Sequence, residues 1–278
     1  MVNRELNGKT AIVTGGGSGI GQAISLALAS RGVNITIADI NAESGEAVAR
    51  EIVQAGGRAI AVRADVSNSA DVSALVERTL SELGVVSILV NNAGVCRIKR
   101  LLDTTDQDLD LIMKSIVYGT ILCTREVWRS MREQGFGHII QICSRAAGWY
   151  PAEEIIYGTA KTAQLKFSLH LESEFNLANR TRRQSGKKKG NYYTHVICPG
   201  SVDTPLNDEI GRTLPKEKML AVEDVAELVL AVVQHPERSW LDCGSEFAGR
   251  SYKVTESEMF GQFPNVIRIR KDPGQSGG

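Results

Sequence analysis

The sequence predicts an α/β fold, a doubly wound three-layer α-β-α arrangement around a parallel sheet of about seven strands. Short apolar segments alternate with longer segments that have helical periodicity. The short segments are β-branched and almost continuously apolar, which is typical of strands covered on both faces. Strands are predicted over 10–14, 33–39, 58–65, 87–92, 137–144 and 193–200. Helices are predicted over about 19–31, 42–55, 69–83, 105–134, 155–178 and 222–234.

The chain is expected to form one domain over residues 1–278. Its 42% hydrophobic content can supply a large core, and no change in composition marks a boundary. A basic insertion over about 179–191 and a tail over about 268–278 depart from the βα pattern, and the tail is expected to fray. The segment 239–254 is the candidate for a seventh strand.

Charge and cysteine usage exclude several classes of protein. Lys+Arg and Asp+Glu both number 32, which argues against a global nucleic-acid or membrane-surface binder. The five cysteines are scattered without a C-x-x-C pair, and the four histidines have no metal-ligand spacing. We therefore predict reduced, buried thiols and no metal site. Because no long apolar stretch occurs, we also predict a cytoplasmic protein without a membrane span.

A glycine-rich turn, TGGGSGIG at residues 14–21, joins the first strand to the first helix. Gly15, Gly19 and Gly21 allow a sharp turn, close approach of a pyrophosphate and tight helix packing, while Ser18 and Ile20 lie between them. The free N–H groups of the helix then face the phosphates. A flexible loop would not explain the flanking strand and helix, so a dinucleotide site is predicted.

An acidic residue ends the second strand. Asp39 follows Gly21 by eighteen residues, where its carboxylate can accept hydrogen bonds from both hydroxyls of an adenosine ribose and repel a 2′-phosphate. Neither Ser18 nor Ile40 adds a cation for that phosphate. NAD is therefore the predicted cofactor, although Asp39 is also compatible with a role at a helix N-terminus.

The pair Tyr157 and Lys161, in YGTAK, places a phenol and an ammonium on one helix face. This spacing arises often by chance, but other motifs accompany it in a fixed order. They are TGGGSGIG (14–21), DV (65–66), NNAG (91–94), Ser144, YGTAK (157–161) and PGSVDT (199–204). Over roughly residues 5–235 the sequence resembles the short-chain dehydrogenase/reductase family, which implies a Rossmann-type fold.

The resemblance implies a catalytic role for each of three residues. Tyr157 would be the general acid/base on the substrate oxygen, and Ser144 would hydrogen-bond that oxygen. Lys161 would bind the nicotinamide ribose and lower the tyrosine pKa, which is ordinarily about 10. Tyr157, like Lys161, would also contact the cofactor.

The resemblance also implies further cofactor contacts, which are grouped by motif. Asp65 and Val66 would contact the adenine. Asn91, Ala93 and Gly94 would line the cleft, and Pro199, Gly200, Val202 and Thr204 would hold the nicotinamide amide.

One position departs from the family. Its members commonly have an Asn in the helix before the fifth strand, which helps to hold a water in the proton relay to the lysine. Here SIVYGT places Ile116 there, and helix geometry points Ser115 and Tyr118 elsewhere. Because isoleucine cannot hold this water, three outcomes are open: the water is held by other partners, turnover is slow, or the protein is a weakly active member.

Substrate contacts are less specified. Trp149, Tyr150 and Pro151 are placed to wall the substrate site, or to pack beneath the next segment. The segment 201–220 resembles the family's substrate lid. The insertion 179–191 is a solvated loop, a site for anionic groups such as coenzyme A phosphates, or a nucleic-acid patch. Homodimers or homotetramers through 105–134 and 155–178 are the family's usual assemblies.

These residues predict an NAD-dependent oxidoreductase that interconverts a secondary alcohol and a ketone by hydride transfer, with alcohol oxidation favoured. The alternatives are a 3-hydroxyacyl-CoA/3-oxoacyl thioester oxidoreductase and a weakly active NAD-binding subunit of an oligomer. A nucleic-acid-associated protein is the remaining, weaker hypothesis.

Overall fold

The computed structural model describes residues 6–148, 151–209, 214–235, 252–255 and 266–271. Its described strands form one sheet in the order β3-β2-β1-β4-β5-β6-β8-β7. They are β1 (Thr10–Thr14), β2 (Asn34–Asp39), β3 (Ala59–Arg63), β4 (Val86–Asn91), β5 (Phe136–Ile142), β6 (Asn191–Pro199), β7 (Tyr252–Thr255) and β8 (Val266–Lys271). All pairings are parallel except that of β7 with β8 at the edge. The predicted fold class is confirmed.

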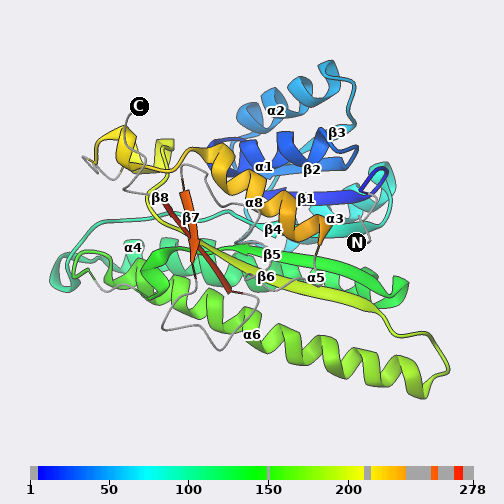
Figure 1. Cartoon of the computed structure of the whole chain (residues 1–278). Coiled ribbons are helices and arrows are strands. Elements are labelled where there is room, and N and C mark those ends of the chain that lie inside the picture. Colours follow the sequence, from blue (N-terminus) through cyan, green and yellow to red (C-terminus); the bar gives the residue numbers. More distant parts are fainter. Residues whose placement is uncertain (1–5, 149–150, 210–213, 236–251, 256–265, 272–278) are drawn as a thin grey trace.

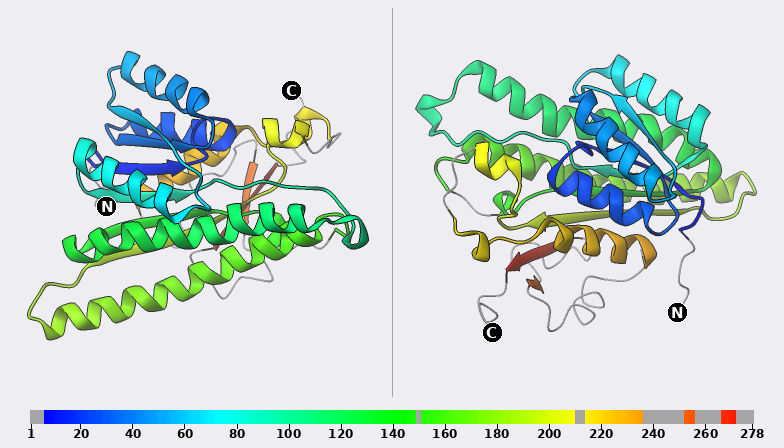
Figure 2. Two further views of the ribbon diagram at one scale, coloured as in Figure 1. Left: turned by 180° about the vertical axis from the view of Figure 1, so that it is seen from behind. Right: turned by 90° about the horizontal axis from the view of Figure 1, so that it is seen from above.

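Helices cover both faces of the sheet, as Figures 1 and 2 show. The longer ones are α1 (Gly19–Ala29), α2 (Ala42–Gln54), α3 (Ser69–Leu83), α4 (Asp106–Met113), α5 (Gly119–Gln134), α6 (Ile155–Gln184) and α8 (Val222–Gln234). A short helix, α7 (Pro205–Glu209), follows β6. In Figure 1, α1, α2 and α8 lie above the sheet and α4, α5 and α6 below it.

Alternating strand residues build two cores. Val13 and Ile140 pack with α1, α2 and α8, whereas their neighbours Ile12 and Ile139 pack with α3, α5 and α6. This is the period of two that a strand imposes on its side chains. Because both faces are covered, the central strands are mostly apolar, which explains why they could be recognised in the sequence.

The strand order reverses between β1 and β4. Chain connections run outward from this point in both directions, through β2 and β3 on one side and β5 and β6 on the other. Open α/β sheets bind ligands in the crevice beyond the carboxyl ends of the strands at such a reversal. The glycine turn follows β1 and the NNAG segment follows β4, so both lie at this crevice.

The predicted helix 105–134 is interrupted. It consists of α4, a π-helical turn at Lys114–Tyr118, and α5. A capping box between Thr105 and Asp108 begins α4, so the helix starts within one residue of the predicted position 105. The π turn inserts one extra residue into a single helical turn. This changes the apolar pattern too little for the turn to be predicted from the sequence. Such turns occur frequently at functional sites.

The C-terminal predictions need correction. The parallel strand beside β6 is β8, not the segment 239–254. Of that segment the structure describes residues 252–254, which belong to β7, and β7 is antiparallel to β8. Residues 268–271, expected to fray, belong to β8, where Ile269 is fully buried. The rest of the expected tail, 272–278, lies outside the described residues.

The basic insertion is partly helical, because α6 continues to Gln184. The Arg182 guanidinium donates to the backbone oxygens of Lys188, Arg132 and Glu133, at 3.0, 2.9 and 3.2 Å. Two of these carbonyls belong to the last turn of α5, where a cation stabilises the helix. At least this basic residue therefore has a structural role that the interpretation as a solvated loop did not include.

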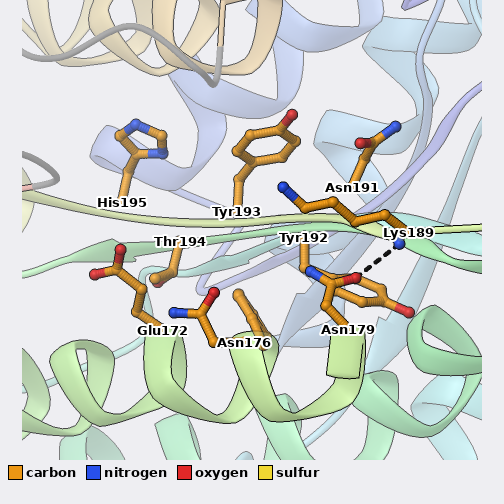
Figure 3. A pocket seen from close by; sticks show the side chains of 11 residues that line it. Glu172, Asn176, Asn179, Lys189, Asn191, Tyr192, Tyr193, Thr194 and His195 are labelled. Carbon is orange, nitrogen blue, oxygen red and sulfur yellow. Dashed lines mark hydrogen bonds between the residues drawn. The ribbon is translucent and has the colours of Figure 1, made fainter. Parts of the chain in front are cut away.

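A polar hollow of about 260 Å³ lies between α6 and the N-terminal half of β6 (Figure 3). Thr194 and Tyr192 point toward α6, whereas Tyr193 and His195 point to the opposite face. Along α6, Arg182 lies roughly 37 Å from Tyr157 at 1.5 Å per residue. This separation removes the support for the insertion as a site for the tail of a substrate bound near Tyr157 in the same chain.

Two histidines on neighbouring strands form a buried pair. His138 Nε2 and His195 Nδ1 lie 2.9 Å apart, and both residues are at most 2% exposed. Burial lowers the pKa of His195 from 6.5 to about 4. His195 therefore stays neutral in the folded chain at pH values where the unfolded chain would bind a proton.

This shift predicts acid sensitivity. His195 should stabilise the fold fully above pH 6.5 and lose that contribution as pH falls toward 4, at a cost of about 3 kcal/mol. Urea unfolding at pH 7.5 and 4.5 measures it, with His195→Asn as the variant because its amide stays near His138. The variant should lose less stability between these two pH values. Equal losses in both proteins would contradict the prediction.

Four cysteines in the described ranges, Cys96, Cys123, Cys143 and Cys198, are free and buried, as expected; Cys243 lies outside these ranges. Within the described part of the chain, no group of three or more His, Cys, Asp or Glu side chains has an arrangement suited to a metal ion. Of the helices described, none is long and apolar enough to cross a membrane.

Candidate active site

The glycine turn is held against β4. Asn92 Nδ2 donates to the backbone oxygens of Thr14 and Gly15, at 3.0 and 3.1 Å. The Thr14 hydroxyl accepts from the N–H groups of Asn92 and Ala93, at 3.0 and 3.1 Å. These bonds fix the ends of β1 and β4 beside each other, at the point where the strand order reverses.

Three positions of the turn require glycine. Gly15 has φ of 60° and Gly19 has φ of 51°, a region that other residues rarely adopt. A Cβ at Gly21 would lie 2.0 Å from the Gly15 carbonyl oxygen. The backbone therefore forms a tight cradle at the start of α1, where the free N–H groups of a helix favour an anion.

Asp39 lies against this cradle. Its two carboxylate oxygens accept from the backbone N–H groups of Gly17 and Asn41, each at 2.9 Å. The carboxylate is thereby oriented at the rim of the cleft, and each oxygen retains capacity for a further donor. Ile40 next to it is 63% exposed and adds no charge.

A cleft of about 690 Å³ runs from Asp39 across the ends of β1, β3 and β4. The predicted cofactor residues that line it are Gly15, Ser18, Gly19, Ile20, Asp39, Ile40, Asp65, Val66, Ala93, Gly94 and Thr204. Gly21 does not line it, because it packs under the turn. Asn91 does not line it either: its side chain is 3% exposed and donates to Thr124 Oγ1, and Asn92 takes its place.

A smaller hollow of about 90 Å³ is lined by two of the three predicted catalytic residues, and Lys161 is buried beside it without lining it. Ser144 and Tyr157 line it together with Pro199, Gly200 and Val202. Ile20, Thr204 and Leu206 line both this hollow and the cofactor cleft, so the two spaces meet there. The predicted walls Trp149 and Tyr150 lie outside the described residues, while Pro151 lines a neighbouring groove.

The segment after β6 is tied at its base. Val202 and Leu220 form a parallel bridge, and Leu220 N–H donates to the Ser201 oxygen at 2.9 Å. Between them, Thr204 and the first residues of α7, Pro205 and Leu206, line the cofactor cleft. Part of the segment predicted to be a lid therefore lies at the site, and its action as a lid stays a prediction.

The three predicted catalytic residues come from two local structures. Ser144 follows β5, and its hydroxyl accepts from Ala146 N–H at 3.1 Å, which begins a short 3₁₀ turn. Tyr157 and Lys161 lie one turn apart near the start of α6. Lys161 is 3% exposed, and its Nζ lies 5.9 Å from the centre of the Tyr157 ring.

The Lys161 ammonium has two fixed acceptors. Nζ donates to the Ile142 backbone oxygen at 2.8 Å and to Gln164 Oε1 at 3.0 Å. A lysine ammonium has three donors, so one remains for another group.

Burial changes the acid–base behaviour of this pair. It raises the pKa of Tyr157 above its usual range, against the smaller lowering effect of a hydrogen bond with Ser144. Burial also lowers the pKa of Lys161. The pKa of Tyr157 was expected to be lowered, but in the protein without cofactor it is raised. Burial of the phenolate away from water outweighs the effects that lower this pKa.

Ile116 occupies the π turn and is fully buried. It packs with Ile112 and Ala160, with Tyr157 against the same cluster. A Cβ at Gly94 would lie 2.9 Å from Ile116 Cγ1 and 3.8 Å from Lys161 Nζ, so Gly94 lies close to both. Ser115 bonds the Ile112 oxygen and Tyr118 is 57% exposed, and neither takes the place of the missing Asn.

Several residues of the site were not predicted. Gln107, Asp110, Leu111 and Lys114 bring one side of α4 and its π turn to the cofactor cleft. Cys96, Cys143, Glu154 and Asn207 line the smaller hollow. Gln164 could have been found, because a residue three positions after Lys161 shares its helix face.

Comparison with known proteins agrees with this geometry. The family model described as short chain dehydrogenase matches residues 9–215. The oxidoreductase UcpA of Salmonella typhimurium is 35% identical over 210 residues, covering 75% of this chain and 74% of UcpA. The 7alpha-hydroxysteroid dehydrogenase of Escherichia coli K12 is 32% identical over 240 residues, covering 86% and 92%.

Solved structures show the same fold. A 7α-hydroxysteroid dehydrogenase complexed with NADH and 7-oxoglycochenodeoxycholic acid has a TM-score of 0.74 at 28% identity, covering 84% of this chain and 89% of that one. The 3-ketoacyl-(acyl-carrier-protein) reductase of Brucella melitensis, complexed with NADH, has a TM-score of 0.72 at 30% identity, covering 84% and 93%. The chain belongs to the short-chain dehydrogenase/reductase family and is an oxidoreductase.

Proposed function

We propose that this chain is an NAD-dependent oxidoreductase that interconverts a secondary alcohol and a ketone by hydride transfer. The observation that carries the proposal is the junction of two spaces. The hollow with Ser144 and Tyr157 meets the cleft with the glycine turn at Ile20, Thr204 and Leu206. A dinucleotide in the cleft would end beside the catalytic groups.

The residues of the cleft fit a dinucleotide. The cradle at Gly15 and Gly19, which a side chain would fill, suits a pyrophosphate at the start of α1. Asp39, oriented by two backbone N–H groups, suits a ribose with both hydroxyls free. Its charge would repel a 2′-phosphate, which supports NAD over NADP.

In this proposal Ser144 and Tyr157 hold the substrate oxygen, and a bound nicotinamide supplies the carbon that gives or accepts the hydride. Tyr157, kept protonated by burial, donates its proton to the oxygen of a ketone as the alcohol forms. In the reverse direction the tyrosine must first lose this proton. The Lys161 ammonium would then stabilise the phenolate.

The partners proposed are a small alcohol or ketone and a second copy of the chain. Side chains of α5 and α6, the predicted interface helices, leave apolar surface exposed, at Ile121 (38%) and Leu177 (50%). A homodimer or homotetramer would cover it. Light scattering during size-exclusion chromatography would report the assembly.

The test is NADH formation from a panel of secondary alcohols, hydroxysteroids and 3-hydroxyacyl thioesters, with NADP in parallel and Tyr157→Phe as the control. Tyr157-dependent turnover with NAD supports the proposal. Alcohol oxidation should increase with pH, because the raised pKa of Tyr157 keeps its proton in place at neutral pH.

A weakly active cofactor-binding subunit is the second candidate, because Ile116 presents no polar group beside Lys161. NADH binding without turnover across the panel would favour it.

A further inference from the structure

Gln164 is a buried polar residue in an apolar part of α6. It is 0% exposed and lies on the same helix face as Ala160, Lys161, Leu165 and Ser168. Burying an amide costs free energy unless its oxygen and nitrogen both find partners. An apolar side chain would fill this position at no such cost, so the presence of an amide here points to a role for its hydrogen bonds.

Both ends of the amide are bonded, and one partner is the candidate catalytic lysine. Oε1 accepts from Lys161 Nζ at 3.0 Å, and Nε2 donates to Thr120 Oγ1 at 2.9 Å. Thr120 is 3% exposed and is the second residue of α5, which follows the π turn. The amide therefore joins the ammonium on α6 to the start of α5, four residues after Ile116.

Position 116 offers the ammonium no such partner. Ile116 and Lys161 Nζ both approach Gly94, and the isoleucine presents only carbon atoms. With the Ile142 carbonyl, Gln164 thus supplies the second of the two fixed acceptors of Lys161. The ammonium has a third donor, and Nζ lies close to Gly94, which lines the cofactor cleft.

We propose that Gln164 is a positioning residue for Lys161, and that it supplies the fixed polar contact that position 116 does not. The inference rests on the proposed role of Lys161 beside Tyr157. The amide, oriented by Thr120, holds the ammonium where its charge acts on Tyr157 and on the ribose side of the cleft. Gln164 itself touches neither substrate nor cofactor.

The decisive variant is Gln164→Leu, which keeps the bulk of the side chain and removes the acceptor. With Lys161 no longer held, the Tyr157 phenolate should be less stabilised. The pKa of Tyr157 with NAD bound should rise by about one pH unit, and kcat for alcohol oxidation at neutral pH should fall about tenfold. The acid limb of the pH–rate profile should move upward by the same amount.

The pKa is measured without turnover, by NMR titration of protein labelled with ¹³C in its tyrosine rings and saturated with NAD, using Tyr157→Phe for assignment. Ser168→Ala is the matched control. Ser168 is equally buried on this face, and its hydroxyl donates only to the Gln164 backbone oxygen at 3.1 Å. It should lower stability while leaving both the pKa and the acid limb in place.

Ile116→Asn in the Gln164→Leu background should return the pKa toward its original value, because it offers a polar group next to Gly94, which Lys161 Nζ also approaches. If the Tyr157 pKa of the double variant stayed at the value of Gln164→Leu, the idea that Gln164 replaces a polar contact missing at position 116 would be wrong. An unchanged Tyr157 pKa in Gln164→Leu would overturn the proposal as a whole. Full activity of Tyr157→Phe would instead refute the proposed function, which separates the two failures.

Discussion

Tyr157→Phe is expected to lower kcat for alcohol oxidation and for ketone reduction by about 10² to 10⁴, the usual contribution of a general acid–base group. Phenylalanine keeps the ring that packs beside Ile116 and Ala160, so the fold should remain. The substitution removes the proton donor from the hollow that Tyr157 shares with Ser144. NADH fluorescence titration should give a nearly unchanged Kd, since the main cleft lies beyond the phenol.

A second tyrosine supplies the matched control. Tyr192 is buried, and its hydroxyl donates to the Arg132 backbone oxygen at 3.0 Å, on the N-terminal half of β6 away from the site. Tyr192→Phe should lose about 1 kcal/mol of unfolding free energy and keep full activity. If Tyr157→Phe were as active as Tyr192→Phe, another group would transfer the proton and the mechanism would be wrong.

The elements with strong local signals could be predicted to the residue. Helix α3 occupies 69–83 as expected, because Asn68 accepts from two N–H groups at its start and Gly84 adopts φ of 85° at its end. Strand β1 is likewise as expected, because every residue from Thr10 to Thr14 is buried and apolar or β-branched.

Elements that depend on distant partners could not be predicted. The sequence VIRIRK of β8 alternates apolar and basic residues near the end of the chain and looks like a solvated tail. Its strand conformation comes from pairing with β6 over Val196–Pro199, about 70 residues earlier. The continuation of α6 to Gln184 depends similarly on Arg182 reaching the end of α5.

The candidate site divides in the same way. The order of its motifs predicted which segments meet at the cleft, but not which side chains face it. Successive side chains at the end of β4 point to opposite sides, so Asn91 is buried against Thr124 while Asn92 lines the cofactor cleft. The sequence does not show which of the two asparagines faces the cleft. The direction of the Tyr157 pKa follows from burial, which residue spacing does not specify.

Asp39→Ser should change the cofactor preference. Serine cannot repel a 2′-phosphate and loses one charged acceptor for the ribose hydroxyls, each such bond contributing about 1.5 to 3 kcal/mol. The ratio of kcat/KM with NAD to that with NADP should therefore fall by about 10²-fold or more. Steady-state kinetics with both cofactors at one alcohol concentration measure this ratio.

Glu43→Gln separates a specific contact from general electrostatics. Glu43 is an exposed acid in the first turn of α2, four residues from Asp39, and its N–H bonds the Asn41 cap. If the carboxylate of Asp39 acts through direct contact with the ribose, removing the charge of Glu43 should change the ratio less than twofold at physiological salt, because exposed charges are screened. If both variants shifted the ratio alike, net negative charge at the rim would set the preference. The two backbone N–H groups that orient Asp39 would then be aligning it for the start of α2, as the helix-terminus interpretation of this residue requires.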